Sequence, residues 1–321
     1  MSESPLFAAV EVAEPIAWTS LLPIAFLAAV ACYGWAHVLR RRRAGLEILP
    51  ETPHRQVPWD GGLTLLSAFL YLGLSQIGTG LLMTLVFKWN DPQLPLPVAD
   101  EHSVTDPRWM IAMFQAHGVT SYASVCAVAA LLVGVARARL DDFGLTLADW
   151  RRHLKLGLVG FAVIVPPVVV LQGLLNAVWM ESQHPILVAY RASGDSRLLL
   201  WCTVAAVFVA PFVEEFFFRG ILQGWLERVV AERGASSTVE AAEDEASPSD
   251  VRPPDTSPMP ILFSSTLFAL VHLGSGPDVL PIFFLALGLG YLYRQTHSIW
   301  PGFVVHTTLN AWSMVALVLM P

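Results

Sequence analysis

The sequence predicts an all-α, polytopic integral membrane protein of about eight transmembrane helices. Hydrophobic residues make up 55% of the 321 residues and charged residues only 14%, and the mean hydropathy is +0.56. A soluble domain is far less apolar than this. The apolar residues are also gathered into long runs, several of which reach the roughly 20 residues that an α-helix needs to cross a bilayer. Because lipid offers no water to an open backbone, each run is predicted to be helical.

The first five runs are each long enough to span a bilayer, whereas the sixth and seventh are short enough to be tilted, broken or partly buried in protein. The first run is predicted to be an uncleaved anchor, because acidic residues precede it and Arg40 to Arg43 follow it. In chain order the eight runs lie near 17–39, 62–87, 110–136, 156–179, 197–223, 260–275, 279–295 and 299–320.

Basic residues in the short connections predict the orientation. The connections after the first and third runs carry clusters of arginine and lysine, which marks them as cytoplasmic. Alternation then places Arg294 and the linker with Arg228 and Arg233 on the cytoplasmic side, and both chain ends outside. We expect a multi-pass protein of the plasma (inner) membrane, in contact with its lipids. The clusters that carry this prediction are Arg40 to Arg43 and the group Arg137, Arg139, Arg151, Arg152 and Lys155.

Charge and cysteine content exclude several other classes. The net charge is −7, and no basic face that could hold a nucleic acid emerges. The three cysteines all fall within apolar runs, so neither a disulfide framework nor a paired-cysteine metal site is predicted.

One polar stretch divides the C-terminal half. Residues 231–259 are rich in Ala, Ser, Glu, Asp and Pro and offer almost nothing to bury, so we predict a disordered, acidic cytoplasmic loop there. The predicted organisation is therefore an N-terminal group of transmembrane helices at 1–190, without a recognised motif, and a helical core at 195–320 that this loop interrupts.

Three apolar runs contain ionisable side chains, each of which costs about 2.5–3.5 kcal/mol at a helix centre. The fifth run holds Glu214, Glu215 and Arg219 within Pro211-Phe-Val-Glu-Glu-Phe-Phe-Phe-Arg-Gly220. Glu215 and Arg219 stand four residues apart on one helical face and can pair, whereas Glu214 is turned about 100° away. The other two runs hold the pairs Phe268 with His272 and His306 with Asn310, each at the same spacing.

These side chains fall at similar depths and are predicted to meet in one intramembrane cavity that opens toward the cytoplasm. Glu214 and His272 fit the activation of a water molecule, and His306 and Asn310 fit the stabilisation of an oxyanion. The predicted reaction is hydrolysis of an amide by direct attack of water, without a cofactor. A divalent metal such as zinc, held by Glu214, His272 and His306, stays an alternative, although the His-Glu-x-x-His motif of one zinc protease class is absent.

The remaining polar residues in or near the runs are interpreted as structural. Isolated neutral groups, among them His117, Gln172 and Asn176, are predicted to form hydrogen bonds between helices. The histidines near run ends or in connections, including His54, His153 and His297, are interpreted as solvated and are left out of the site.

The three motifs Glu-Glu-x-x-x-Arg, Phe-x-x-x-His and His-x-x-x-Asn, in this order, resemble those of the type II CAAX prenyl endopeptidases and bacteriocin-processing or immunity proteins (the CPBP or Abi family). Here they stand as Glu214-Glu215 with Arg219, Phe268 with His272, and His306 with Asn310, within about residues 195–320. The resemblance implies an intramembrane endopeptidase whose water-activating pair is Glu214 and His272. It also implies that Glu215 and Arg219 support Glu214, and that the substrate is a peptide or protein, in some members a prenylated one.

Two other classes of function share some of these features. A membrane protein that binds peptides without cutting them, such as a bacteriocin-immunity protein, would keep the same fold, but the intact motifs argue against it. A proton-coupled transporter would also need intramembrane Glu and His, yet the sequence shows neither inverted repeats nor paired broken helices.

Overall fold

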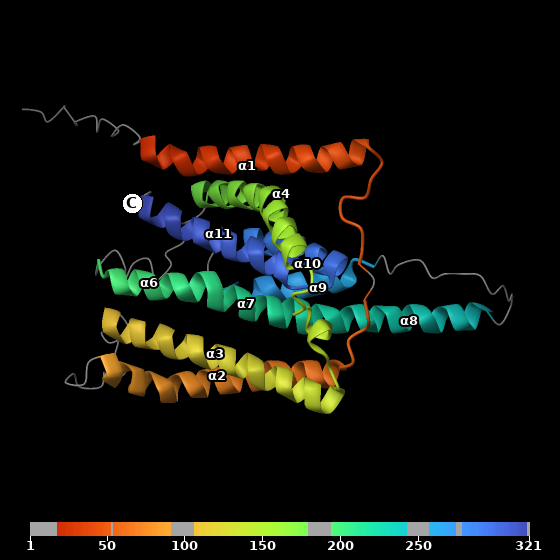
Figure 1. Cartoon of the computed structure of the whole chain (residues 1–321), viewed down its shortest axis with the longest axis horizontal. Coiled ribbons are helices and arrows are strands. Elements are labelled where there is room, and N and C mark those ends of the chain that lie inside the picture. Colours follow the sequence, from red (N-terminus) through yellow and green to blue (C-terminus); the bar gives the residue numbers. More distant parts are fainter. Residues whose placement is uncertain are drawn as a thin grey trace, which may run out of the picture.

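The computed structural model describes residues 18–52, 54–90, 106–178, 194–242, 257–273 and 278–319. Within these ranges the chain is helical apart from short connections, and the helices lie roughly along one common direction (Figure 1). Five helical segments are long and apolar enough to cross a membrane: Leu22–Arg43, Gly61–Val86, Pro107–Ala136, Trp150–Val178 and Ser196–Gly234. The predicted fold class, an all-α polytopic membrane protein, is therefore confirmed.

A helix stands at each of the eight predicted places. The N-terminal four are α1 (Trp18–Arg43), α2 (Gly61–Asn90), α3 (Pro107–Ala136) and α4 (Trp150–Val178). The fifth place is a composite helix made of α6 (Ser196–Val204), η3 (Ala205–Val209), α7 (Ala210–Glu214), η4 (Glu215–Gln223) and α8 (Gly224–Ala242). The C-terminal three are α9 (Met259–Leu270), α10 (Val279–Thr296) and α11 (Trp300–Leu319). With 12 residues, α9 is too short to cross a bilayer by itself.

The outer helices expose apolar side chains in helical register. Along α2, Phe69, Ile77 and Leu81 are each at least 66% exposed, at spacings of four or eight residues. An apolar stripe of this length on a soluble protein would drive aggregation, whereas in a bilayer it faces lipid. The exposed stripe therefore supports the membrane assignment independently of the composition.

Helices α9, α10 and α11 pack against the composite helix, with α2 and α3 on one side of it and α4 and α1 on the other (Figure 1). One apolar core contains Trp59, Phe143 and Phe216, the last of which belongs to the composite helix. A second apolar core lies between α1, α4, α10 and α11. The short helix η2 (Leu140–Phe143) lies in the connection between α3 and α4. This connection packs on the turn between α10 and α11, where the backbone N–H of Ile299 donates to the carbonyl of Gly144 at 3.1 Å. Gly144 permits this approach, since its φ is +71° and a Cβ there would lie 2.9 Å from the backbone nitrogen of Ile299.

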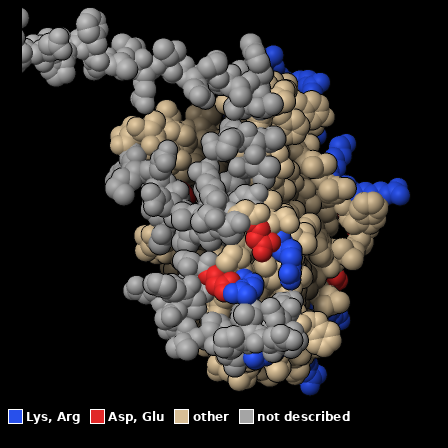
Figure 2. Space-filling view, turned by 90° about the vertical axis from the view of Figure 1, so that its left-hand side faces the viewer, with Lys and Arg blue, Asp and Glu red and all other residues tan. Residues whose placement is uncertain are grey.

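The two ends of the bundle differ in charge. The last turn of α1 is Arg40 to Arg43, at the end from which α8 also projects (Figure 1). At the opposite end Asp106 caps α3 and pairs with Arg108 at 3.0 Å, and Figure 2 shows acidic and basic side chains next to each other on this face. The basic end is the one that we predict to be cytoplasmic.

The prediction of a disordered loop over 231–259 is wrong for residues 231–242, which continue α8 as helix. The polar composition of this stretch indicates that it buries little, but it does not prevent a helix, because Ala, Glu and Arg all favour one. Arg228 and Glu232 add an ion pair of 2.7 Å one turn apart at its start. Residues 243–256 of the predicted loop lie outside the described ranges. The division of the chain into an N-terminal part (1–190) and a helical core (195–320) stays a prediction.

Candidate active site

The two predicted carboxylates lie where the composite helix changes its hydrogen-bonding pattern. Glu214 is the last residue of α7, and Glu215 is the first residue of η4. Both η3 and η4 are π-helical, a rare backbone form that occurs mostly at functional sites. Its wider turn still leaves residues four apart as neighbours, and Arg219 Nε lies 3.6 Å from Glu215 Oε2. The predicted pairing of these two residues is confirmed.

Side chains from outside the composite helix hold its π-helical segments. Five backbone carbonyls in η3 and η4 accept a hydrogen bond from a side chain of another part of the chain. Such donors satisfy carbonyls that an irregular helix leaves poorly bonded. The five bonds are Asn310 to Ala206 (2.7 Å), Thr307 to Val207 (2.9 Å), Tyr122 to Phe208 (3.3 Å), Ser264 to Phe218 (2.8 Å) and Trp59 to Ile221 (3.2 Å).

The carboxylate of Glu214 lies between two imidazoles from different helices. Its Oε1 is 3.9 Å from His272 Nε2, and its Oε2 is 3.6 Å from His306 Nε2. The side chains of Glu214 and His272 are 23% and 27% exposed, whereas that of His306 is only 8% exposed. Water and a substrate can therefore reach the cluster at its Glu214–His272 edge.

The tautomer of His272 follows from its neighbour. Its Nδ1 lies 2.7 Å from the carbonyl oxygen of Phe268, one turn earlier. A carbonyl can only accept, so Nδ1 carries a proton, and Nε2 is the nitrogen that faces Glu214; in a neutral ring it would present a lone pair there. Two acceptors facing each other at 3.9 Å can hold the two hydrogens of one water molecule.

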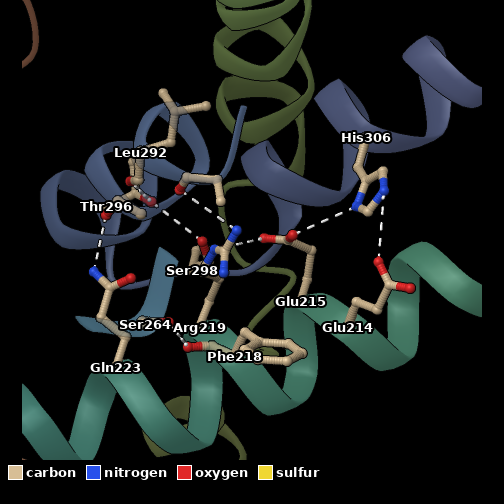
Figure 3. A network of polar contacts seen from close by, with 12 residues as sticks. Glu214, Glu215, Phe218, Arg219, Gln223, Ser264, Leu292, Thr296, Ser298 and His306 are labelled. Carbon is tan, nitrogen blue, oxygen red and sulfur yellow. Dashed lines mark hydrogen bonds and ion pairs between the residues drawn. The ribbon is translucent and has the colours of Figure 1, made fainter. Parts of the chain in front are cut away.

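Behind Glu214 lies a fully buried ionic group (Figure 3). Glu215 and Arg219 are both 0% exposed, and His306 Nδ1 is 3.6 Å from Glu215 Oε1. His306 thus lies between two carboxylates, one accessible and one buried. The group is closely packed, since a Cβ added to Gly302 of α11 would collide with the Glu215 carboxylate.

Phe268 is the apolar centre of the group. Its ring lies 5.0 Å from the ring of His272 and 6.0 Å from that of His306, measured between centroids. The guanidinium carbon of Arg219 lies 4.9 Å above the same ring, a cation–π distance. One phenyl ring therefore contacts both imidazoles and the buried cation.

The structure places Asn310 differently from the other predicted residues. Its amide nitrogen donates to the carbonyl of Ala206, two helical turns before Glu214. One N–H of Asn310 is thereby used to hold η3, and the second is left to donate elsewhere.

Among the described residues, Glu214, His272 and His306 do not form a cluster with the close spacing of ligand atoms that a metal site needs. Among the residues that the structure describes, the side chains whose possible ligand atoms come within 4.8 Å of one another are Glu51, His54 and His297. They lie at the end of the bundle where α1 and α10 end, away from the three motifs.

The sequence did not reveal several residues that shape the site. Thr307 and Ser264 are ordinary hydroxyl residues in apolar helices, and only the π-helical backbone beside them makes them important. Gly302 could have been noticed, because it lies four residues before His306 on the same helix. The interpretation of His117 as a structural group agrees with its contacts, since its Nδ1 lies 3.4 Å from Thr79 Oγ1 of the neighbouring helix.

Comparison with protein-family models matches residues 196–312 to the family described as type II CAAX prenyl endopeptidase Rce1-like. No curated protein and no solved structure matched the chain. The matched range contains all three motifs and the composite helix, which agrees with the resemblance drawn from the motifs. Peptidase activity is the general property of that family. Residues 196–312 of this chain are thus similar to the CAAX-type family of intramembrane proteases.

Proposed function

We propose that the protein is an intramembrane endopeptidase that hydrolyses a peptide bond with a water molecule activated by Glu214 and His272. The observation that carries this proposal is the position of the Glu214 carboxylate between two imidazoles, at an edge that is partly exposed. A carboxylate and a neutral imidazole that face the same space can share the task of orienting and deprotonating water. His306 lies next to this edge, and its ring is positioned between the carboxylates of Glu214 and Glu215.

The oxyanion of the tetrahedral intermediate would be stabilised by His306 and Asn310. The Nε2 of His306 lies 3.6 Å from Glu214 Oε2, beside the carboxylate that would activate the water. The remaining N–H of Asn310, one turn further along α11, supplies a second donor whose orientation is fixed by the bond to Ala206. Glu215 and Arg219 are positioning residues: they hold His306 from behind and do not touch the substrate.

The substrate is a peptide or a protein segment that reaches the Glu214–His272 edge from within or beside the membrane, lipidated or not. The basic last turn of α1, the arginines that follow α3, and Arg228 and Arg233 of α8 support a cytoplasmic position of this end of the bundle. His306 lies two turns after the start of α11 at the same end, which supports an active site in the cytoplasmic half. A reporter inserted between Ala242 and Ser257 tests the orientation, and an external location would overturn it.

The decisive experiment is cleavage of a library of free and prenylated peptides by the purified full-length protein in detergent. Glu214→Gln keeps the shape of the side chain but removes the base, so kcat should fall about 10²- to 10⁴-fold. Glu232→Gln, the same change at an exposed position of the composite helix, should leave kcat unchanged. Full activity of Glu214→Gln would refute the mechanism. Activity that chelator abolishes, and that zinc restores, would favour the metal alternative.

Absence of cleavage by a well-folded wild-type protein would contradict the enzymatic proposal. Binding of the same peptides without cleavage would then support the peptide-binding or immunity function that shares this fold.

A further inference from the structure

A second cluster of titratable side chains lies at the basic end of the bundle, outside the proposed active site. It joins Glu51 and His54, from the connection between α1 and α2, to His297, which follows α10. One possible ligand atom from each of the three lies within 4.8 Å of the other two. The cluster borders a cavity of about 400 Å³, which also has Glu227 and Arg294 in its wall.

His297 was expected to be solvated, and this interpretation is wrong. Its side chain is only 8% exposed, and its backbone adopts a left-handed conformation with φ at +44°. That conformation ends α10, and the imidazole lies against Glu51 and His54. The sequence could not show this, because the covering segment is more than 240 positions away.

The buried Nε2 of His297 makes no hydrogen bond. It lies 3.5 Å from Glu51 Oε1, and the ring is stacked on that of His54 with centroids 3.1 Å apart. A buried polar atom without a hydrogen bond is unusual and calls for a partner.

The other nitrogen of His297 faces a second carboxylate. Its Nδ1 lies 3.8 Å from Glu227 Oε2, and Glu227 is itself held by Gln223 at 2.9 Å and by Arg294 at 3.5 Å. Histidines that bind metals almost always direct their second ring nitrogen to such an acceptor, which fixes the tautomer and leaves Nε2 for the metal.

We propose that Glu51, His54 and His297 bind a divalent transition metal of the zinc type, which clamps the α1–α2 connection to the turn between α10 and α11. Two imidazole nitrogens and one carboxylate oxygen suit Zn²⁺, and the fourth position faces the cavity. The lone pairs of two stacked rings do not converge, so His54 must turn out of the stack. His54 is exposed, and this rotation is open to it.

The clamp would reinforce a contact that already exists, because the backbone N–H of Thr52 donates to the carbonyl of Gln295 at 2.9 Å. Two of the three ligands belong to the part of the chain outside the family match. The site would therefore be a feature of this chain, added to the protease core. His297 lies nine residues before His306, so the metal would fix the start of the helix that carries His306.

The test is titration of metal-free, full-length protein in detergent with Zn²⁺, followed by calorimetry and by elemental analysis after gel filtration. The wild type should bind one ion per chain. His54→Gln and His297→Gln should each weaken binding at least about 100-fold, and Glu227→Gln about 10- to 100-fold through the second ring nitrogen. Glu47→Gln, an exposed carboxylate of the same connection, and Glu214→Gln should bind as the wild type does.

Hydrogen exchange gives a readout that does not depend on activity. Zn²⁺ should slow the exchange of amides in residues 46–57 in the wild type and not in His54→Gln. Because His54 is exposed, this variant should unfold at the wild-type temperature without metal, which excludes misfolding as the cause. Absence of binding by the wild type, full binding by His54→Gln and His297→Gln, or loss of binding only in Glu214→Gln would each overturn the proposal.

Discussion

Replacing Arg219 with methionine tests the buried ionic group directly. The change keeps much of the side-chain volume but removes the guanidinium from Glu215 at 3.6 Å, from the Ala286 carbonyl at 3.5 Å and from the ring of Phe268. Glu215 then keeps its contact with His306 Nδ1 at 3.6 Å. Since no part of the Glu215 side chain is exposed, water cannot replace the lost cation.

Removing one partner of a buried ion pair lowers the free energy of unfolding by about 3–5 kcal/mol. This corresponds to a factor of roughly 100 to 4,000 in the folding equilibrium. The measurement is reversible unfolding of the purified protein in mixed micelles with a denaturing detergent, followed by tryptophan fluorescence.

Two further variants separate charge from packing. The double variant Glu215→Met with Arg219→Met removes both buried charges, and its free energy of unfolding should lie within about 1 kcal/mol of the wild type. Its peptidase activity should still be lost, because His306 is no longer held from behind. Glu232→Gln breaks the shorter but exposed pair with Arg228 and should cost at most about 1 kcal/mol.

An Arg219→Met variant as stable as the wild type would refute the description of the pair as desolvated. A double variant as unstable as the single one would show that the packing of the guanidinium, and not its charge, supports the helix.

Three other predictions concern the surroundings of this group. Gly302→Ala should reduce kcat at least about 100-fold with the expression level unchanged, because its Cβ would displace the Glu215 carboxylate; a fully active variant would disprove the close contact. Ser264→Ala should lower the free energy of unfolding by about 1–3 kcal/mol, since the buried carbonyl of Phe218 loses its donor, and an unchanged unfolding curve would contradict this. Asp106→Ala should cost about 1 kcal/mol at neutral pH by removing the cap of α3. The hydrogen bonds from Arg108 lower the pKa of Asp106 in the folded protein, so this stabilisation is present above the ordinary value of 3.8 and disappears only as the pH falls through the lowered pKa; a difference that is lost already near pH 6 would exclude this cause.

The sequence was sufficient where the determining interactions are local. Glu215 and Arg219 are four residues apart on one helix, so their pairing follows from helical geometry alone. The positions of the helices also follow from local composition, because lipid permits no other backbone. The convergence of Glu214, His272 and His306 could be expected because the three side chains fall at similar depths in their helices.

The sequence was insufficient where distant segments decide the outcome. Nothing in the apolar pattern distinguishes a π-helical turn from an α-helical one, so the roles of Thr307 and Ser264 as donors were hidden. Burial of His297 depends on a segment near residue 51. The helical state of residues 231–242 was missed for a different reason: their composition describes what they can bury, whereas a helix that extends into water needs only favourable backbone propensity.

The five side chains that hold the π-helical segments have a consequence for biogenesis. The donor side chains come from α3, α9, α11 and the segment before α2. Those from α3, α11 and the segment before α2 lie more than 80 positions from the carbonyls that they bond. When the composite helix first enters the bilayer, α9 and α11 have not yet been synthesised, and a regular α-helix then satisfies its backbone best. The π-helical turns, and with them the final directions of Glu214 and Glu215, would arise only after the last helix has inserted. A chain released before α11 is complete would therefore lack the carboxylate–imidazole arrangement altogether.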